Sequence, residues 1–348
     1  MTESDSTTPI EPHMLAPSFS GIDTFWRAPF VSPQAVPEGY VAVLGVPNEM
    51  TLSTRIGTRY GPKAIRQHSC HFIAQTRATP AREYVTVGSG DCFRIPDAIP
   101  LVDVGDALLF PNDLEHSGQS ITQTVRTLVE RGALPISLGG DHYIAFPLVR
   151  GFCDGLRKRQ GYRRFGYIQI DAHLDAAGEN LVWGRHWHGS NARLISELPG
   201  ISKKNMAWIG INGSTWTDEW NFATTDGACM ITRPEIAKIG IGEAARRALL
   251  VAADSVDAVY LSVDLDVVDV SLSPGVGSVN FGGISPAELL EAIETLAGAE
   301  IIRGLDVVEL CPPLDPSGVT GRLAAAVVMT FLEPRLFERI KRGSHERR

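Results

Sequence analysis

The sequence predicts an α/β protein built on a parallel sheet that helices cover on both faces. Apolar, strand-like segments alternate with helix-like segments along most of the chain, a pattern typical of α/β folds. The strand-like segments are unbroken by polar residues, as expected for parallel strands buried on both sides. Clusters of Asp and His follow several of these segments directly, at the carboxyl end where such sheets keep their sites.

The amino-terminal residues 1–38 are rich in Pro, Ser and Thr and lack periodicity, so we predict an N-terminal arm there. Its aromatic pair, Phe25 and Trp26, could dock the arm onto the body or onto a neighbouring subunit. We expect residues 39–348 to form one catalytic domain, because the chain shows no internal repeat and no domain linker.

The elements of this domain follow from apolar runs, helical periodicity and turn residues. We expect strands near 41–47, 101–104, 134–138, 165–170, 206–211, 228–231, 256–263 and 300–308. We expect helices near 61–75, 112–131, 143–159, 188–197, 217–225, 234–252, 285–297 and 319–341. Pro62 suits the first turn of the first of these helices.

Composition argues against a nucleic-acid-binding, membrane or secreted protein. The 348 residues are 44% hydrophobic, enough for a large core, and the formal charge of −8 argues against nucleic acid or an anionic membrane as a partner. The five cysteines show no CxxC spacing, which favours reduced, packed thiols in an intracellular protein. No apolar run is as long as a membrane span, and the polar start is unlike a signal peptide. We therefore expect a cytoplasmic protein.

The run FGYIQIDAHLDAAG is the centre of the functional prediction. An apolar strand ends in Asp171, His173 and Asp175, and residues two apart on an extended chain point to the same side. Carboxylate oxygen and imidazole nitrogen together are ligands for divalent metals. Taken alone, the motif could equally be loop polarity and helix capping.

Two further segments repeat this design. VDAVYLSVDLDVVD ends in Asp264 and Asp266, and SLGGDHYIAFP places His142 after a Gly-Gly turn. Three strand ends thus supply two imidazoles and four carboxylates. Four negative charges roughly neutralise two divalent ions, whereas one ion would be crowded by six ligands. The three segments together favour a two-metal site over capping.

With GGDH, DAHLD and SVDLDVVD in that order, the chain resembles the ureohydrolases, the family of arginase and agmatinase. The segments FSGIDTFWRAP, STRIGTRYGPKAIR and DVVELCPPLDPSGVTGRLAA resemble the agmatinase branch, so the likeness covers nearly the whole chain. The resemblance implies a three-layer αβα sandwich with a mainly parallel sheet, assembled as a trimer or hexamer. It also implies two divalent ions, Mn²⁺ or, as in relatives acting on guanidine or biguanides, Ni²⁺.

The resemblance also implies roles for individual residues. One ion would be held by His142, Asp171, Asp175 and Asp264, and the other by His173, Asp171, Asp264 and Asp266. Two such ions lower the pKa of a bridging water, and Asp175 would carry a proton to the leaving nitrogen.

Two more positions match the family. His188 resembles a histidine that shuttles protons, although a helix-capping histidine is the alternative. Glu309 resembles the glutamate that grips the substrate guanidinium, and a carboxylate accepts such a planar donor fork with both oxygens. A salt-bridge partner would sit on a polar surface, whereas Glu309 ends the apolar run IIRGLDVVEL.

The chain departs from the family around the substrate entrance. The polar run that holds the amino-acid end of arginine is replaced by Gly184 to Gly189, which disfavours arginine. Val270, Val279, Asn280 and Phe281 replace residues usual in agmatinases. Four tryptophans fall in two loops expected near the site: Trp183, Trp187, Trp216 and Trp220. They predict an aromatic pocket for a delocalised cation, with core or interface packing as the alternative.

The sequence therefore predicts a binuclear hydrolase of a small cationic guanidino or biguanide compound, such as guanidine or metformin. It would cleave a C–N bond and release urea or guanylurea with an amine or ammonia. The alternatives are an agmatinase or guanidinobutyrase, and a subunit of a hetero-oligomer with a homologous chain. A non-catalytic subunit is disfavoured because all six ligands are present, and a single-zinc deacetylase because both bridging aspartates are present.

Overall fold

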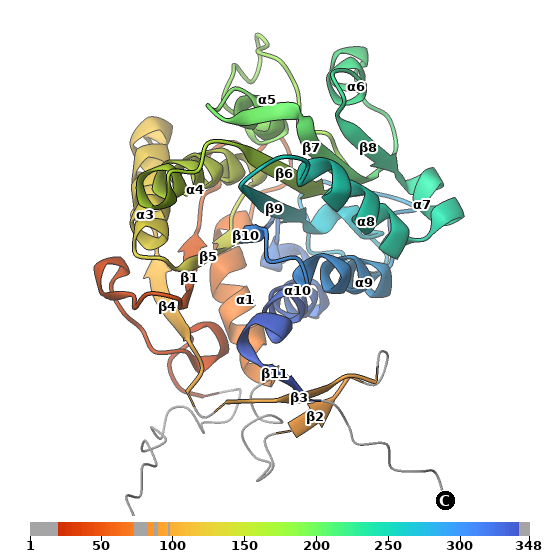
Figure 1. Ribbon diagram of the computed structural model, residues 1–348. Helices are drawn as coiled ribbons and strands as arrows, with labels where there is room; N and C mark the ends of the chain where they lie inside the picture. Colours follow the sequence, from red (N-terminus) through yellow and green to blue (C-terminus); the bar gives the residue numbers. More distant parts are fainter. Residues whose placement is uncertain (1–19, 73–82, 87–89, 97, 341–348) are drawn as a thin grey trace, which may run out of the picture.

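The computed structural model (Figure 1) describes residues 20–72, 83–86, 90–96 and 98–340. Its centre is an eight-stranded sheet in the order β4-β1-β5-β10-β9-β6-β7-β8, and every neighbouring pair is parallel. The strands are β1 (Val41–Val46), β4 (Leu101–Asp106), β5 (Leu134–Gly139), β6 (Phe165–Ile170), β7 (Ile201–Ile211), β8 (Cys229–Thr232), β9 (Ala258–Asp264) and β10 (Ile302–Val308). The predicted α/β fold with a parallel sheet is confirmed.

Helices cover both faces of the sheet and complete three layers (Figure 1). One layer holds α1 (Gly61–Ser69), α8 (Ile241–Ala252), α9 (Pro286–Ala297) and α10 (Val319–Leu336). The other holds α3 (Leu114–Glu130), α4 (Ala145–Gln160) and α5 (Asn191–Ser196). Along β6, Phe165 and Tyr167 enter one core while Ile168 and Ile170 enter the other. Apart from Gln169 the strand carries no polar side chain, because both of its faces are buried.

The structure corrects the predicted helix over 234–252. Two helices occupy it, α7 (Arg233–Ile239) and α8, and the break between them is Gly240. Gly240 has a φ of +83°, a conformation that costs little only for glycine. The Thr232 hydroxyl accepts a hydrogen bond from the Glu235 backbone N–H and so begins α7.

The last predicted helix is also shorter than expected. It ends at Leu336, and Glu338–Ile340 form β11, which pairs antiparallel with β3 (Cys92–Arg94). β3 pairs in turn with β2 (Glu83–Val85). Three-residue strands from distant parts of the chain leave no periodic signal, so this second sheet was not predicted. The predicted helix over 61–75 ends at Ser69 and a 3-10 turn, Cys70–Phe72, follows; residues 73–75 lie outside the described residues.

The aromatic pair near the start packs onto the body of its own chain. Phe25 and Trp26 are fully buried. The backbone N–H of Phe25 donates to Asp103 and that of Trp26 to Ser69 Oγ, each at 2.7 Å. Residues 1–19 of the predicted arm lie outside the described residues. Among the helices that the structure does describe, none combines the length and apolarity needed to cross a membrane.

Candidate active site

Five neighbouring strands, β5, β10, β9, β6 and β7, end at one edge of the sheet. His142 follows β5 in the 3-10 turn His142–Ile144, and Glu309 follows β10. Asp264 ends β9, Asp171 follows β6, and Asn212 follows β7. Because the strands are parallel, their carboxyl ends bring these side chains to one place.

The first potential metal group is His142 with Asp171, Asp175 and Asp264, all four buried. His142 Nδ1 lies 2.8 Å from Asp175 and 3.1 Å from both Asp171 and Asp264. Nδ1 forms no hydrogen bond within the described residues. One imidazole nitrogen facing three carboxylates in a buried site fits a divalent cation, which would share these ligands and offset their charge.

The second potential metal group is His173 with Asp171 and Asp266. His173 Nδ1 lies 3.0 Å from Asp266 and 3.5 Å from Asp171. The resemblance places Asp264 in this group as well. Asp264 Oδ1 accepts a 2.8 Å hydrogen bond from the Asp266 backbone N–H and Oδ2 faces His142. Asp171 Oδ1, which faces His173, accepts the His173 backbone N–H in the same way, at 2.6 Å.

The electrostatics of these carboxylates also fit bound cations. Burial, and then repulsion by Asp266 and Asp171, raises the pKa of Asp264 well above its ordinary value. Burial likewise raises the pKa of Asp266 to about 6, although the positive charge of His173 opposes the shift. Nearby divalent charge would remove this penalty and keep the carboxylates ionised.

A second set of side chains orients these ligands. His142 Nε2 lies 3.0 Å from Ser262 Oγ, and the Ser262 hydroxyl donates to Asp306 at 2.5 Å. Gln169 Nε2 donates to Asp171 Oδ2 at 2.7 Å. Partners of this kind fix the tautomer of a ligating histidine and the orientation of a ligating carboxylate.

Glu309 and His188, both buried, form the other half of the site. Glu309 Oε1 accepts the His142 backbone N–H at 2.8 Å and lies 3.2 Å from His188 Nδ1. Glu309 Oε2 has no hydrogen-bond partner among the described residues. Glu309 and Asp175 are non-glycine residues with left-handed backbone, at φ +63° and +47°, a costly conformation that concentrates at functional sites.

Ser53 contacts the far side of the His188 ring. Its hydroxyl lies 2.6 Å from His188 Nε2, and its backbone N–H donates to the same nitrogen at 3.1 Å. Burial opposes protonation of the ring, but Glu309 outweighs it and raises the pKa of His188 to about 9. The neutral ring accepts at Nε2 from the backbone, and the protonated ring donates there to the hydroxyl. Nδ1–H faces Glu309 in both states.

A network around Asp141 holds the loop that carries Ser53. Asn48 Nδ2 donates to both oxygens of the fully buried Asp141, at 2.9 and 3.0 Å. The Thr51 backbone N–H donates to Asp141 at 3.1 Å, and the Thr51 carbonyl accepts from the His188 backbone N–H. The loop and His188 are thus tied to one buried carboxylate.

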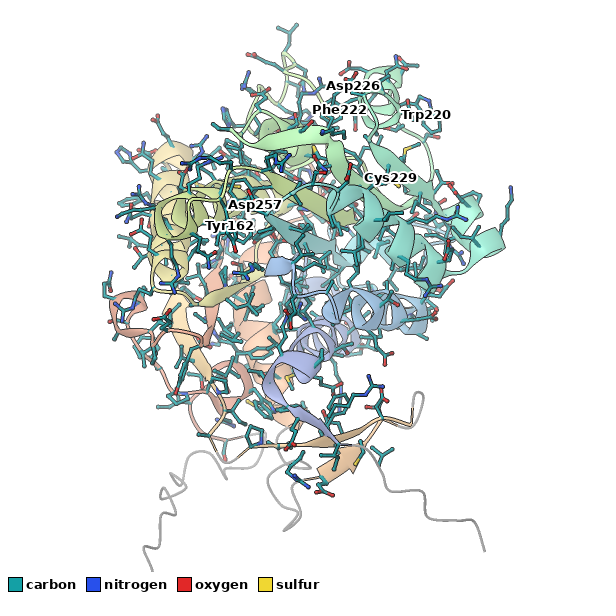
Figure 2. All side chains as sticks on the ribbon, viewed as in Figure 1. Tyr162, Trp220, Phe222, Asp226, Cys229 and Asp257 are labelled. Carbon is teal, nitrogen blue, oxygen red and sulfur yellow. The ribbon has the colours of Figure 1, made fainter. Side chains whose placement is uncertain are left out.

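Part of this site lines one pocket of about 240 Å³. Its lining includes Trp187 and Trp216, together with Glu309 and residues of both metal groups. Trp183 stacks on Trp187, with ring centroids 5.9 Å apart, but does not line the pocket. Trp220 lies on α6 (Thr217–Thr224), as Figure 2 shows, and 46% of its surface is exposed.

Asn280 does not line the pocket but is hydrogen-bonded to a residue that does. Its Oδ1 accepts a 2.9 Å hydrogen bond from Asn212 Nδ2, and Asn212 lines the pocket. Sequence reasoning did not single out Ser53, Gln169, Asn212, Glu219, Ser262 and Asp306. The polar Ser262 and Gln169 inside otherwise apolar strands were the available signal, since a polar residue in a buried strand needs a partner.

Comparisons with known proteins agree with this geometry. The Arginase family profile matches residues 40–333. A guanidinopropionase of Pseudomonas aeruginosa is 30% identical over 91% of this chain and 92% of its own length. A guanidinobutyrase of the same organism is 28% identical, over 91% and 93%.

The fold comparison points the same way. The solved structure of proclavaminate amidinohydrolase from Streptomyces clavuligerus has a TM-score of 0.76 at 28% identity, covering 92% of this chain and 99% of that one. A formiminoglutamase from Trypanosoma cruzi, described with two Mn²⁺, shares the fold with a TM-score of 0.70 at 22% identity. With the profile match and the potential metal groups, these findings show that the chain belongs to the arginase family of metal-dependent ureohydrolases.

Proposed function

We propose that this ureohydrolase acts on a small guanidino or biguanide compound with a compact cationic core, such as guanidine or metformin. Hydrolysis adds water across one C–N bond. Guanidine would give urea and ammonia, and a dimethylated biguanide would give guanylurea and dimethylamine.

We assign the metal ligands to the six residues of the two groups: His142, Asp171, His173, Asp175, Asp264 and Asp266. They would hold two ions, Mn²⁺ or Ni²⁺. Such ions supply a water of lowered pKa close to neutral pH. The two ions would offset the charge of the four aspartates, so the attraction for a cationic substrate would come from Glu309.

The observation that carries the proposal is the orientation of Glu309. Its Oε1 is held by the His142 backbone N–H and by His188, and its buried Oε2 has no partner among the described residues. A buried carboxylate oxygen without a partner is costly, and a guanidinium N–H would satisfy it. Glu309 would therefore orient the planar substrate beside the metal groups.

Two residues are suited to move the proton that the leaving nitrogen needs. Asp175 lies within the first metal group, and Asn191 Nδ2 donates to its Oδ2 at 2.9 Å. His188 can take up and release a proton at Nε2 through the Ser53 hydroxyl, 2.6 Å away. General acid–base transfer by such groups typically contributes about 10²–10⁴-fold to the rate.

The pocket favours a compact substrate. Its volume of about 240 Å³ is bounded by the Trp187 and Trp216 rings, whose faces attract delocalised cations. The agmatinase or guanidinobutyrase alternative rests on relatives carrying those names, at 28% identity each.

The test is urea or guanylurea release from guanidine, metformin, agmatine, guanidinobutyrate and arginine, by Mn²⁺-loaded and Ni²⁺-loaded protein. We expect guanidine or metformin to have the highest kcat/KM. Higher values for agmatine or guanidinobutyrate would establish the alternative instead. The mass of the active species would also test the predicted trimer or hexamer, or assembly with a homologous chain.

A further inference from the structure

Glu219 is a carboxylate in the pocket that the roles above leave unused. It lies in the first turn of α6, three residues after Trp216, and is half-buried where it lines the pocket beside His173 and Asp175. Among the described residues it forms no salt bridge, and its carboxylate accepts a hydrogen bond from the Ala176 backbone N–H. The nearby Arg193 is bound to Asp218 at 2.6 Å and to the Ala176 carbonyl at 2.7 Å.

Glu219 is the carboxylate at the pocket whose negative charge neither the metal ions nor the substrate guanidinium would neutralise. The two metal groups contain Asp171, Asp175, Asp264 and Asp266, which two divalent ions would neutralise. Glu309 would be neutralised by the substrate guanidinium. Glu219 then keeps a negative charge at the pocket, and no Lys or Arg is among the residues that line it.

The surroundings of Glu219 already penalise its charge. Glu219 is half-buried where it lines the pocket, so its carboxylate has lost part of its hydration. A cation next to Glu219 would relieve that penalty, whereas a second anion would increase it. The guanidinopropionase and guanidinobutyrase relatives are named for substrates that carry a carboxylate at the end remote from the guanidino group.

We infer that Glu219 determines substrate charge: it favours guanidino compounds whose second polar group is cationic, accepts neutral ones, and excludes guanidino acids. This inference rests on the proposed function, because it assumes that the guanidinium binds at Glu309. It narrows the substrate class to cationic and neutral guanidines and biguanides.

If Glu219 had only a structural role, its replacement would have different effects. An acidic residue in the first turn of a helix stabilises the helix through its dipole. Loss of that effect would lower the thermal stability of the protein and change the binding of all substrates alike. Only a specificity role makes the effect depend on substrate charge.

Three ligands of similar length separate these possibilities: agmatine, n-butylguanidine and 4-guanidinobutyrate, with a cationic, neutral and anionic end. Their KM values and their dissociation constants, the latter from quenching of tryptophan fluorescence, would be measured for Mn²⁺-loaded wild-type protein. The same measurements would be made on Glu219→Gln, Glu219→Lys and the control Glu179→Gln. Glu179 is an exposed carboxylate outside the pocket lining.

In wild-type protein we expect agmatine to bind tightest and guanidinobutyrate weakest. Glu219→Gln should weaken agmatine binding by about tenfold and leave n-butylguanidine within about twofold. Glu219→Lys should reverse the order of agmatine and guanidinobutyrate, and Glu179→Gln should leave it unchanged.

Equal changes for all three ligands in Glu219→Gln, or a wild-type preference for guanidinobutyrate, would overturn the inference. If none of the three ligands releases urea but their binding constants still depend on the charge at position 219, the charge preference of the pocket stands. The proposed function fails separately if guanidine and metformin, assayed in parallel, are not hydrolysed either.

Discussion

Replacing Ser262 by alanine tests how far the site depends on the groups behind its metal ligands. Ser262 Oγ links His142 Nε2, at 3.0 Å, to Asp306, at 2.5 Å, and all three residues are fully buried. Ser262→Ala removes one oxygen and two hydrogen bonds without adding volume. It leaves a buried imidazole N–H and a buried carboxylate oxygen without this partner.

The size of the effect follows from those two losses. Each unsatisfied buried group costs about 1–3 kcal/mol, so the two losses together should lower the free energy of unfolding by about 2–6 kcal/mol. Because His142 loses the partner that fixes its tautomer and orientation, affinity for Mn²⁺ should fall by about 10–100-fold. Saturating Mn²⁺ should restore most of kcat, since Ser262 does not line the pocket.

The assays are chemical unfolding of the metal-free protein and a Mn²⁺ titration followed by activity and by thermal stability. Ser273→Ala is the matched control, because Ser273 is also fully buried and its hydroxyl has no hydrogen-bond partner among the described residues. If Ser262→Ala binds Mn²⁺ as tightly as Ser273→Ala does, the proposed orientation of His142 through Ser262 is refuted.

Three further outcomes are expected. Glu309→Gln should lower kcat/KM by at least about 100-fold with metal content unchanged, as measured by steady-state kinetics and metal analysis; near-normal activity would contradict the role of Glu309. Chelation should lower the Tm, because buried carboxylates such as Asp264 then repel one another, and Mn²⁺ should restore it. His188, with a pKa raised to about 9 from 6.5, should stabilise the fold fully below pH 6.5 and lose that contribution as pH rises through about 9. Its imidazole signal in NMR should titrate lower in Glu309→Gln, and an unchanged titration would contradict the assigned cause.

The strands were the most predictable part of the fold. Apolar runs such as Phe165–Ile170 are bounded by polar residues on both sides, and a strand buried on both faces has little freedom in sequence. The helices were placed well where their ends carry strong signals, as at Ser285, whose hydroxyl begins α9 in a capping box. The break at Gly240 was missed because a single glycine within a helical pattern is often tolerated.

The metal groups were predictable for a different reason. Their residues come in pairs two apart, as in Asp264 and Asp266, directly after a recognisable strand. Spacing alone did not show which carboxylate oxygen faces which imidazole: Asp264 Oδ2 faces His142, while its Oδ1 accepts from the Asp266 backbone N–H. Short motifs identify ligand types, whereas the direction of each oxygen depends on contacts that only the folded chain defines.

Ser53 and Glu219 were not found from the sequence, because neither belongs to the metal-ligand motifs or follows a sheet strand directly. Ser53 reaches His188, 135 residues away, through a loop held by Asp141. Glu219 enters the pocket because β7 lies beside β6, so that the helix after β7 starts next to the residues that follow β6. Strand order is a property of the whole sheet and cannot be predicted from the residues of any single segment. The potential metal ligands can therefore be predicted from the sequence, whereas the positions of Ser53 and Glu219 at the site depend on the folded chain.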